Sequence, residues 1–438
     1  VLTYYLVNIM KIKSIYIFIL LALLSVTGCS GVLDIEKHGN MGTLEDFSSN
    51  DEEVQEATAA IFASVRGTSY LGAYHQLYAL VNLLSDDYYT GGSTRGDQSQ
   101  LEQVNEYTFG SDLNWIKNVY TNLYKTIYYC NLVIDNVPEP STTIQKRCVA
   151  EARFFRGWAH FELVSLWGRV PIVDHLLTPS EYRQGNSEIA DIYSFVEGEF
   201  LSAINSGALP SKTSLKDTAT GIYVTKEAAY AFLGKAYVFA GDYASAADAF
   251  EKIISSGLYA LWDGDYSLIR KMAANNCCEN ILELQYANDP DNKWYQTDNF
   301  TAYHGWRFAK FTWSGDAASQ ITKGGYGFYN PSKDLYDAFV EMEGEDGYRL
   351  NSCLKTNDWM KSWGCSLNAG EVLAGHEGIY DFKYRNLTSD LVVNYSYQWF
   401  YRVNHLLMRY AEVLLLASEA NLKAGNQAKA DQYLNLVR

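Results

Sequence analysis

Proline is scarce in this sequence, with 7 residues among 438, and basic residues are few, 35 Lys and Arg against 51 Asp and Glu. The formal net charge of −16 argues against nucleic acid as a partner, because phosphates are bound by clustered Lys and Arg. It also argues against adhesion to an anionic bilayer through basic patches. The apolar run at residues 15–24 is too short to cross a bilayer, since a spanning helix takes about 20 residues.

Catalytic signatures are missing as well. The sequence has no G-x-S-x-G, no H-E-x-x-H and no G-x-x-x-x-G-K, and the stretch GGYGF lacks dinucleotide-binding spacing. The histidines show no metal-ligand clustering, and His304 alone lies among aromatic residues. Carboxylate pairs such as Asp86 with Asp87, or Glu343 with Glu345, are expected by chance in so acidic a chain. The sequence therefore predicts a protein that is not an enzyme.

Cysteine is sparse, with 7 residues, and the first of them, Cys29, directly follows a segment that has the features of a secretory signal. Two lysines precede the apolar run, and small residues stand directly before Cys29. A basic start, a short apolar core and small residues before a cut form a secretory leader. The arrangement resembles the lipobox of bacterial lipoproteins, which predicts that Cys29 carries lipid and anchors the chain, whereas an ordinary secretory cut would leave it unmodified. We expect residues 1–28 to be removed, with Met10 as the true start.

The remaining six cysteines permit disulfides in an exported chain but do not fix their pairing. Two pairings between neighbours in the sequence are possible, Cys130 with Cys148 and Cys353 with Cys365. No C-x-x-C spacing is present, so we predict no metal site at these residues and leave buried thiols or disulfides as the two alternatives.

What the sequence does contain is a helical hairpin at residues 225–257. Thr225 is a typical first residue of a helix, and the apolar residues after it follow helical spacing up to Gly241. A second apolar face follows and ends at Gly257. Small residues at the positions where the two helices approach each other are typical of tetratricopeptide hairpins.

Residues 409–438 repeat this hairpin. Both segments carry Ala-x-x-x-Ala-Gly at the turn, and the repeat places Leu434 and Val437 at the positions of Phe250 and Ile253. Two hairpins with one pattern are expected to share one packing arrangement.

Two further helices are predicted from apolar spacing, one at residues 113–137 and one beginning at Cys148 and ending at Gly168. We expect the large side chains of the second helix to form core rather than a ligand site; they are Phe154, Phe155, Trp158, Phe161, Leu163 and Trp167. The fold class predicted is mostly α, with tetratricopeptide-like hairpins separated by long aromatic loops.

The two longest loops, residues 86–110 and 287–331, are rich in glycine and aromatic residues and are not expected to be helical. Loops this long are usually functional or disordered, and disordered segments are poor in aromatic residues. Aromatic rings beside short polar groups suit the apolar faces and hydroxyl rims of sugars. The candidate ligand-binding residues are Tyr88, Tyr89, Trp294, Tyr295, Trp306 and Arg307. Asp289, Asp291 and Asn292 would permit a structural calcium ion, and no other cofactor is predicted.

Four stretches resemble the SusD/RagB family of Bacteroidetes outer-membrane lipoproteins, through essentially the whole mature chain. They are GVLDIEKHGN after Cys29, AEARFFRGWAHFELVSLWGRVPIV, GGYGFYNPSKDLYDAF followed by DGYR, and LLMRYAEVLLLASEANLKAG. His38 stands where the family often has proline. Family members usually continue past the position of Arg438, so we expect the sequence to be truncated at its C-terminus.

The resemblance implies four tetratricopeptide-like units, an N-terminal half over residues 29–225 and a C-terminal half over residues 226–438. It also implies an outer-membrane, surface-exposed lipoprotein that captures oligosaccharide or polysaccharide for import. The protein would sit as a lid on a SusC-like TonB-dependent barrel, its tetratricopeptide face on the barrel and its loops toward ligand. The alternatives are a peptide-binding uptake lipoprotein of the same family and a lipid-anchored tetratricopeptide scaffold for envelope assembly. A glycosidase would need two carboxylates in one cleft.

Overall fold

A computed structural model describes residues 50–67, 72–289, 291, 298, 300–392 and 399–438. Cys29, which is predicted to carry lipid, lies outside these residues. Residues Asn50–Arg438 belong to one unit of mutual contacts. Within the described part of the chain, no helix is both long enough and apolar enough to cross a membrane. The division into halves at residue 225 stays a prediction.

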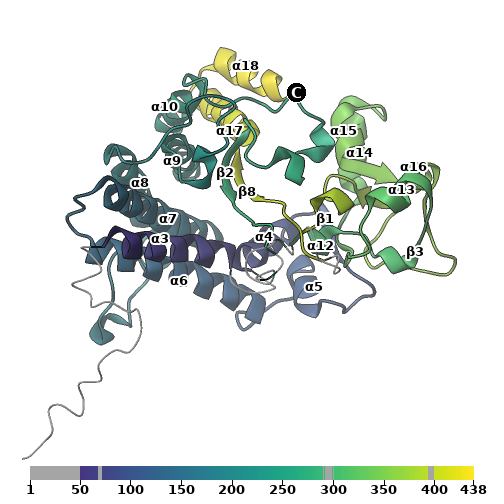
Figure 1. The fold of residues 1–438 in the computed structure, drawn as a ribbon, viewed down its shortest axis with the longest axis horizontal. Coiled ribbons are helices and arrows are strands. Elements are labelled where there is room, and N and C mark those ends of the chain that lie inside the picture. The colour runs from purple at the N-terminus through teal and green to yellow at the C-terminus, as the bar shows by residue number, and fades with distance from the viewer. Residues whose placement is uncertain (1–49, 68–71, 290, 292–297, 299, 393–398) are drawn as a thin grey trace, which may run out of the picture. The chain divides into compact units, whose positions relative to one another are not determined.

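Long helices packed in series make up the larger part of the fold (Figure 1). Each helix contacts the next in the series, from α3 through α6, α7, α8, α9, α10 and α17 to α18. Their bounds are α3 Asp51–Arg66, α6 Asn114–Asn136, α7 Thr143–Trp167, α8 Ile189–Asn205, α9 Lys226–Ala240, α10 Tyr243–Ile254, α17 Tyr410–Lys423 and α18 Gln427–Val437. The chain leaves this helical stack after α10 and returns at α17, which packs directly on α10. The predicted fold class, mostly α with tetratricopeptide-like hairpins, is confirmed.

The hairpin α9–α10 forms as the sequence predicts. The Thr225 hydroxyl accepts a hydrogen bond from the Ala228 amide and caps α9, and Gly241 ends the helix in the left-handed conformation, φ +84°. Gly234 lies where the helices cross, and a Cβ there would come within 2.6 Å of the Phe250 ring. A residue without a side chain is therefore needed for the two helices to approach this closely.

The hairpin α17–α18 is confirmed, but one of its predicted inward residues is wrong. Leu434 is 39% exposed, and Tyr433 is buried instead. The Tyr433 hydroxyl donates a hydrogen bond to Glu251 on α10, at 2.7 Å, which turns this face of α18 toward the stack. Tyr433 stands at the position of Ala249, which is also buried, so the inward face of the first hairpin is kept at this position but not at Leu434.

The helices α6 and α7 are also confirmed. The inward residues predicted for α7 are buried, apart from the half-buried Trp167 at its end, and Gly168 terminates the helix with φ +69°. All six cysteines beyond Cys29 are free thiols, so neither of the two possible disulfides is present in the structure. Cys130 and Cys148 lie buried in α6 and α7, where they pack as small apolar residues.

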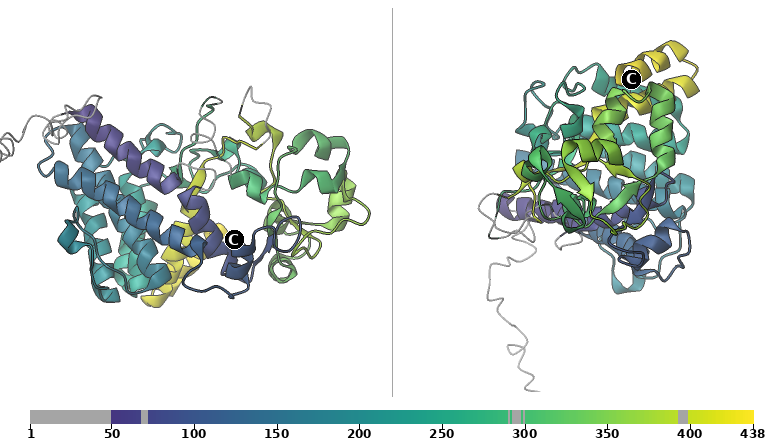
Figure 2. Two further views of the ribbon diagram at one scale, coloured as in Figure 1. Left: turned by 90° about the horizontal axis from the view of Figure 1, so that it is seen from below. Right: turned by 90° about the vertical axis from the view of Figure 1, so that its right-hand side faces the viewer.

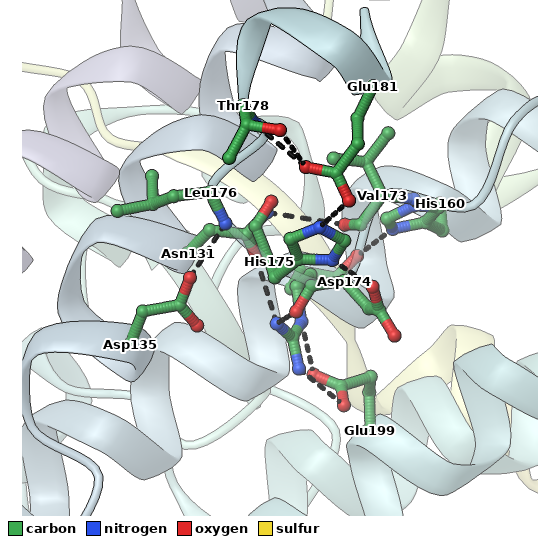
Figure 3. A network of polar contacts seen from close by, with 11 residues as sticks. Asn131, Asp135, His160, Val173, Asp174, His175, Leu176, Thr178, Glu181 and Glu199 are labelled. Carbon is green, nitrogen blue, oxygen red and sulfur yellow. Dashed lines mark hydrogen bonds and ion pairs between the residues drawn. The ribbon is translucent and has the colours of Figure 1, made fainter. Parts of the chain in front are cut away.

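A buried ion pair joins α7 to α8. Arg156, 3% exposed, donates through Nε and Nη2 to the two carboxylate oxygens of Glu199, at 2.8 and 2.9 Å. Its Nη1 donates to Asn131 Oδ1 and to the Asp174 carbonyl. Glu199 and Asn131 lie among the polar contacts drawn in Figure 3. Glu199 also accepts from Arg153 Nη1 at 3.0 Å, so each charge has more than one partner, as a buried guanidinium and carboxylate require.

The segment after α7 is held by the same network (Figure 3). His160 Nε2 accepts a hydrogen bond from the Val173 amide, which leaves Nδ1 as the donor to the Arg156 carbonyl. His160 is therefore neutral, and burial lowers its pKa to about 4. His175 bridges Asp174 and Glu181, and these hydrogen bonds raise its pKa.

Among the residues that the structure describes, those outside the stack form short elements beside it (Figures 1 and 2). Four two-stranded antiparallel sheets pair β1 Tyr88–Gly91 with β4 Phe328–Pro331, β2 Asn280–Leu284 with β8 His405–Arg409, β3 Phe311–Trp313 with β6 Cys365–Leu367, and β5 Leu354–Thr356 with β7 Ile379–Asp381. The helices are α4 Ala73–Leu83, α5 Ser99–Asn105, α12 Phe300–His304, α13 Gly315–Gln320, α14 Lys333–Glu343, α15 Tyr348–Cys353 and α16 Asn357–Trp363. Single 3₁₀ turns are η2 Pro179–Glu181, η3 Thr220–Ile222, η4 Tyr266–Leu268, η5 Met272–Ala274, η6 Phe308–Lys310 and η7 Thr388–Asp390.

The expectation that residues 86–110 and 287–331 contain no helix is wrong. The first segment contains α5, and the second contains α12 and α13. These helices have 7, 5 and 6 residues, too few for an apolar period to be visible in the sequence.

Candidate functional site

A groove of about 920 Å³ lies beside β1 and contains two of the predicted ligand residues, Tyr88 and Tyr89. It is lined by β1, by residues of α5, by Asp334 from the start of α14, and by two loop segments, residues 93–95 and residues 372–375, which we call its two walls. We call this space the β1 groove. It joins segments that are far apart in the sequence, because β1 pairs with β4 in the register Tyr89 to Asn330.

The two neighbouring tyrosines of β1 differ in direction, because successive side chains of a strand point to opposite faces. The Tyr88 hydroxyl points inward and donates to Asp381 Oδ2, at 3.4 Å. Burial and the nearby carboxylate raise the pKa of Tyr88 well above its usual value. Tyr89 is 37% exposed, and burial together with the charge of Glu377 raises its pKa. The pair therefore offers one accessible ring, that of Tyr89.

Gly375 allows the far wall to approach the Tyr89 ring. A Cβ at this position would lie 2.6 Å from Tyr89 Cβ and 3.2 Å from its Cγ. Its φ of +52° is also a conformation that favours glycine. The position of the Tyr89 ring is thus fixed by a backbone that only glycine can provide here.

Residues 93–97 are held in a fixed loop by charged side chains. Asp97 accepts from the Ser93 amide at 2.8 Å and pairs with Arg307, and Glu102 accepts from the Gly96 amide at 2.7 Å. Arg95 pairs with Glu106 at 2.5 Å. Arg307, which the sequence predicts to touch ligand, is not among the residues that line the groove, and its guanidinium pairs with Asp97.

Lys310 joins the two walls of the β1 groove. Its ammonium donates to the Ser93 carbonyl at 2.9 Å and to the Val372 carbonyl at 2.6 Å, and it pairs with Glu371 at 3.2 Å. Ser93 and Val372 both line the groove, one in each wall segment. One side chain therefore sets the distance between the two walls.

Lys310→Met should loosen both walls, because the apolar stem is kept and the ammonium is lost. Hydrogen bonds from a charged donor contribute about 1.5–3 kcal/mol each, so local opening becomes easier by at least one such bond. We expect amide hydrogen exchange of residues 93–97 and 371–375 to become about tenfold faster or more. Lys333→Met, which removes an exposed lysine paired with Asp337, is the matched control. Unchanged exchange in Lys310→Met would rule out this bridging role.

The other predicted ligand residues lie elsewhere. Trp306 is 4% exposed, with its ring stacked near Trp313 and edge-on to Trp363 and Tyr380. A ring covered in this way presents no face to a ligand, so we leave Trp306 out of the site. Trp294 and Tyr295, like Asn292 of the possible calcium site, lie outside the described residues.

His304 also belongs to the core. It is 2% exposed and stacks on the Tyr384 ring at 4.1 Å between centroids. Neither ring nitrogen has a hydrogen-bond partner among the described residues. Burial, with His75 and cationic side chains nearby, lowers the pKa of His304 well below its usual value.

The sequence gives no signal for three residues that shape the groove: Gly375 and Asn105, which line it, and Lys310, which binds two of its lining residues. Asn105 donates to the carbonyls of Leu83 and Tyr88 and accepts from the Thr90 amide, so it positions β1. No local pattern marks these residues, because each acts on a segment that becomes its neighbour only after folding. Of the carboxylates considered for catalysis, Glu343 accepts from the amides of Arg349 and Leu350 at the start of α15, and Asp86 lines the groove.

A second hollow of about 770 Å³ lies among α3, α7, η3 and β2. Two aromatic side chains line it, and the rings of both pack against other side chains of the protein. The Arg147 guanidinium lies 4.4 Å from the centre of the Tyr223 ring, and Phe62 packs edge-on against Phe155 at 4.7 Å. The β1 groove, with the accessible ring of Tyr89, is therefore the better candidate for a binding site.

Two family models match the chain. The one described as starch-binding associating with outer membrane matches residues 46–238, and the one described as the SusD family matches residues 371–438. The chain is 26% identical to SusD-like protein P2 of Formosa agariphila, over 97% of this chain and 81% of that protein.

Solved structures share the fold. A laminarin binding SusD-like protein superposes with a TM-score of 0.74 and 22% identity, covering 89% of this chain and 84% of that one. Surface glycan-binding protein A from Bacteroides thetaiotaomicron, in complex with laminarihexaose, has a TM-score of 0.71 and 20% identity, covering 88% of this chain and 82% of that one.

Proposed function

Since the chain belongs to the SusD/RagB family, we propose that it is a cell-surface glycan-binding protein that captures oligosaccharide or polysaccharide in the β1 groove. The observation that carries this proposal is the exposed ring of Tyr89, set in a groove of about 920 Å³ between two polar loops. The protein would bind its ligand without a chemical step.

The chemistry of the groove fits a sugar. A pyranose ring has an apolar face of C–H groups, which packs on an aromatic ring, and hydroxyls at its rim. Carboxylates accept hydrogen bonds from such hydroxyls. Asp334 and Glu377 lie near Tyr89, and Ser85, Thr94 and Glu102 are further polar groups of the groove. The names of two structural relatives, which bind laminarin and laminarihexaose, support a saccharide as the ligand.

Attachment and handover are further parts of the proposal. Lipid on Cys29 would hold the protein at the outer membrane, exposed at the surface. A SusC-like TonB-dependent barrel would receive the ligand. Family membership supports this partner, and the stack offers exposed apolar side chains for a contact, among them Leu415 and Leu422 on α17 and Leu436 on α18.

A binding screen tests the function. The purified protein, starting at Ser30, is titrated by calorimetry with neutral and acidic oligosaccharides and with mixed peptides. We expect Tyr89→Ala to weaken saccharide binding about 30-fold, because a central aromatic contact contributes about 2 kcal/mol. Tyr128→Ala, which removes a 54% exposed tyrosine from α6, is the matched control and should bind normally.

Circular dichroism shows whether each variant keeps its helices. Peptide binding without saccharide binding would instead favour the peptide-uptake alternative. A folded protein that binds neither would favour the scaffold alternative. Equal losses in Tyr89→Ala and Tyr128→Ala would remove the β1 groove from the proposal.

A further inference from the structure

The β1 groove is strongly acidic. Four carboxylates line it, those of Asp86, Glu102, Glu106 and Asp334, against one guanidinium, that of Arg95, which gives a net formal charge of −3. Asp86, Glu106 and Asp334 are exposed, so these charges face the solvent that a ligand would displace.

The cations around the groove already have partners within the protein. Arg95 pairs with Glu106 at 2.5 Å, and Arg307 pairs with Asp97. Lys310 is held by Glu371 and two carbonyls. Each of these three cations therefore bonds to a protein oxygen, and Lys333, next to Asp334, pairs with Asp337. An incoming anion would have to compete with these oxygens.

The charges around Tyr89 are also negative. Burial is the main cause of its raised pKa, and the charges of Glu377 and Asp334 raise it further. A negative charge on the phenol is disfavoured by these two carboxylates, and a negative charge on a ligand stacked against the ring would be disfavoured for the same reason.

We propose that the β1 groove selects uncharged saccharides and rejects those that carry carboxylate or sulfate groups. This inference rests on the proposed function and specifies its ligand class. The carboxylates accept hydrogen bonds from neutral sugar hydroxyls, whereas like charges placed together weaken the binding of an acidic sugar. Selectivity of this kind comes from repulsion of the wrong ligand as well as attraction of the right one.

The test compares neutral saccharides with acidic counterparts of the same backbone: laminarin with carboxymethylated laminarin, galactose oligomers with galacturonate oligomers, and mannose oligomers with mannuronate oligomers. At low salt, we expect each neutral member that binds to do so at least about tenfold more tightly than its acidic counterpart. Added salt should reduce the difference by screening the repulsion, while leaving neutral binding nearly unchanged.

A charge variant links the selectivity to this groove. Asp86→Asn with Asp334→Asn keeps side-chain size and should strengthen binding of the acidic counterpart several-fold, with a smaller change for the neutral ligand. Asp191→Asn with Asp248→Asn makes the same change in total charge on exposed positions of α8 and α10, and should leave the selectivity unchanged.

The two proposals fail in different ways. If an acidic saccharide binds as tightly as its neutral counterpart, or more tightly, the selectivity is wrong and the saccharide-binding function stands. If no saccharide of either class binds, the function itself is wrong. If both double variants change the selectivity equally, the effect comes from total charge and the assignment to the β1 groove is overturned.

Discussion

Replacing Glu199 with glutamine is expected to lower the free energy of unfolding by about 3–5 kcal/mol, because it leaves a buried guanidinium without its counter-charge. Arg156 is 3% exposed and binds both oxygens of Glu199. A neutral amide keeps the shape but can accept from only one of these donors. Urea denaturation, followed by circular dichroism, measures the change as a lower midpoint with an unchanged slope.

The control for this substitution is an exposed pair. Lys333 and Asp337 pair at 2.5 Å on α14 with side chains 58% and 53% exposed, so Asp337→Asn should change stability far less than Glu199→Gln does. Similar losses in Glu199→Gln and Asp337→Asn would mean that burial of the Arg156 pair adds nothing. In a second variant, Arg156→Met with Glu199→Leu, removal of both charges should recover part of the loss.

His304→Phe is expected to make the protein more stable, and increasingly so as the pH falls. The imidazole is buried without hydrogen-bond partners, so phenylalanine fills the same space without burying unsatisfied nitrogens. Below pH 6.5 the unfolded histidine takes up a proton that the folded one refuses, because its folded pKa is well below the usual value. The natural protein therefore loses stability through His304 as the pH falls below 6.5. The variant has no histidine at this position and does not lose this contribution.

The size of this effect follows from linkage. Between pH 7.5 and pH 5 the advantage of His304→Phe should grow by about 2 kcal/mol, because the unfolded histidine takes up nearly one proton over the 1.5 pH units below its pKa of about 6.5. Parallel urea titrations at pH 7.5 and pH 5 measure it. His175→Phe is the control of opposite sign, since hydrogen bonds to Asp174 and Glu181 raise the pKa of His175. An advantage of His304→Phe that does not depend on pH would show that the folded protein also protonates His304.

The helical stack could be predicted because its signals are local. Thr225, Gly241 and the apolar spacing between them lie within a single hairpin, and each specifies a cap, a turn or an inward face. The exception is Leu434, which is exposed although the matching Phe250 is buried, while Tyr433 beside it binds Glu251 of another hairpin. A repeat pattern contains no information about such a partner.

The β1 groove could be predicted only in part. The sequence marks Tyr88 and Tyr89 as aromatic residues beside polar ones, but a four-residue strand is too short to reveal its alternation, so it does not predict the inward direction of Tyr88. The burial of Trp306 could not be predicted either, because the sequence around a loop aromatic residue is similar whether the ring packs in the core or binds a ligand. Lys310 left no signal, since its partners Ser93 and Val372 are distant in the sequence.

The pairing of β1 with β4 has a consequence for the order in which parts of the protein fold. Tyr88 pairs with Pro331, and the far wall of the groove comes later still, at residues 372–375. Closing a loop of this length costs entropy before any contact repays it, so the groove is expected to assemble after the local hairpins. A partly folded chain would then display tetratricopeptide helices yet capture nothing. Ligand capture would thus serve as a readout of complete maturation, one that secondary-structure content alone does not provide.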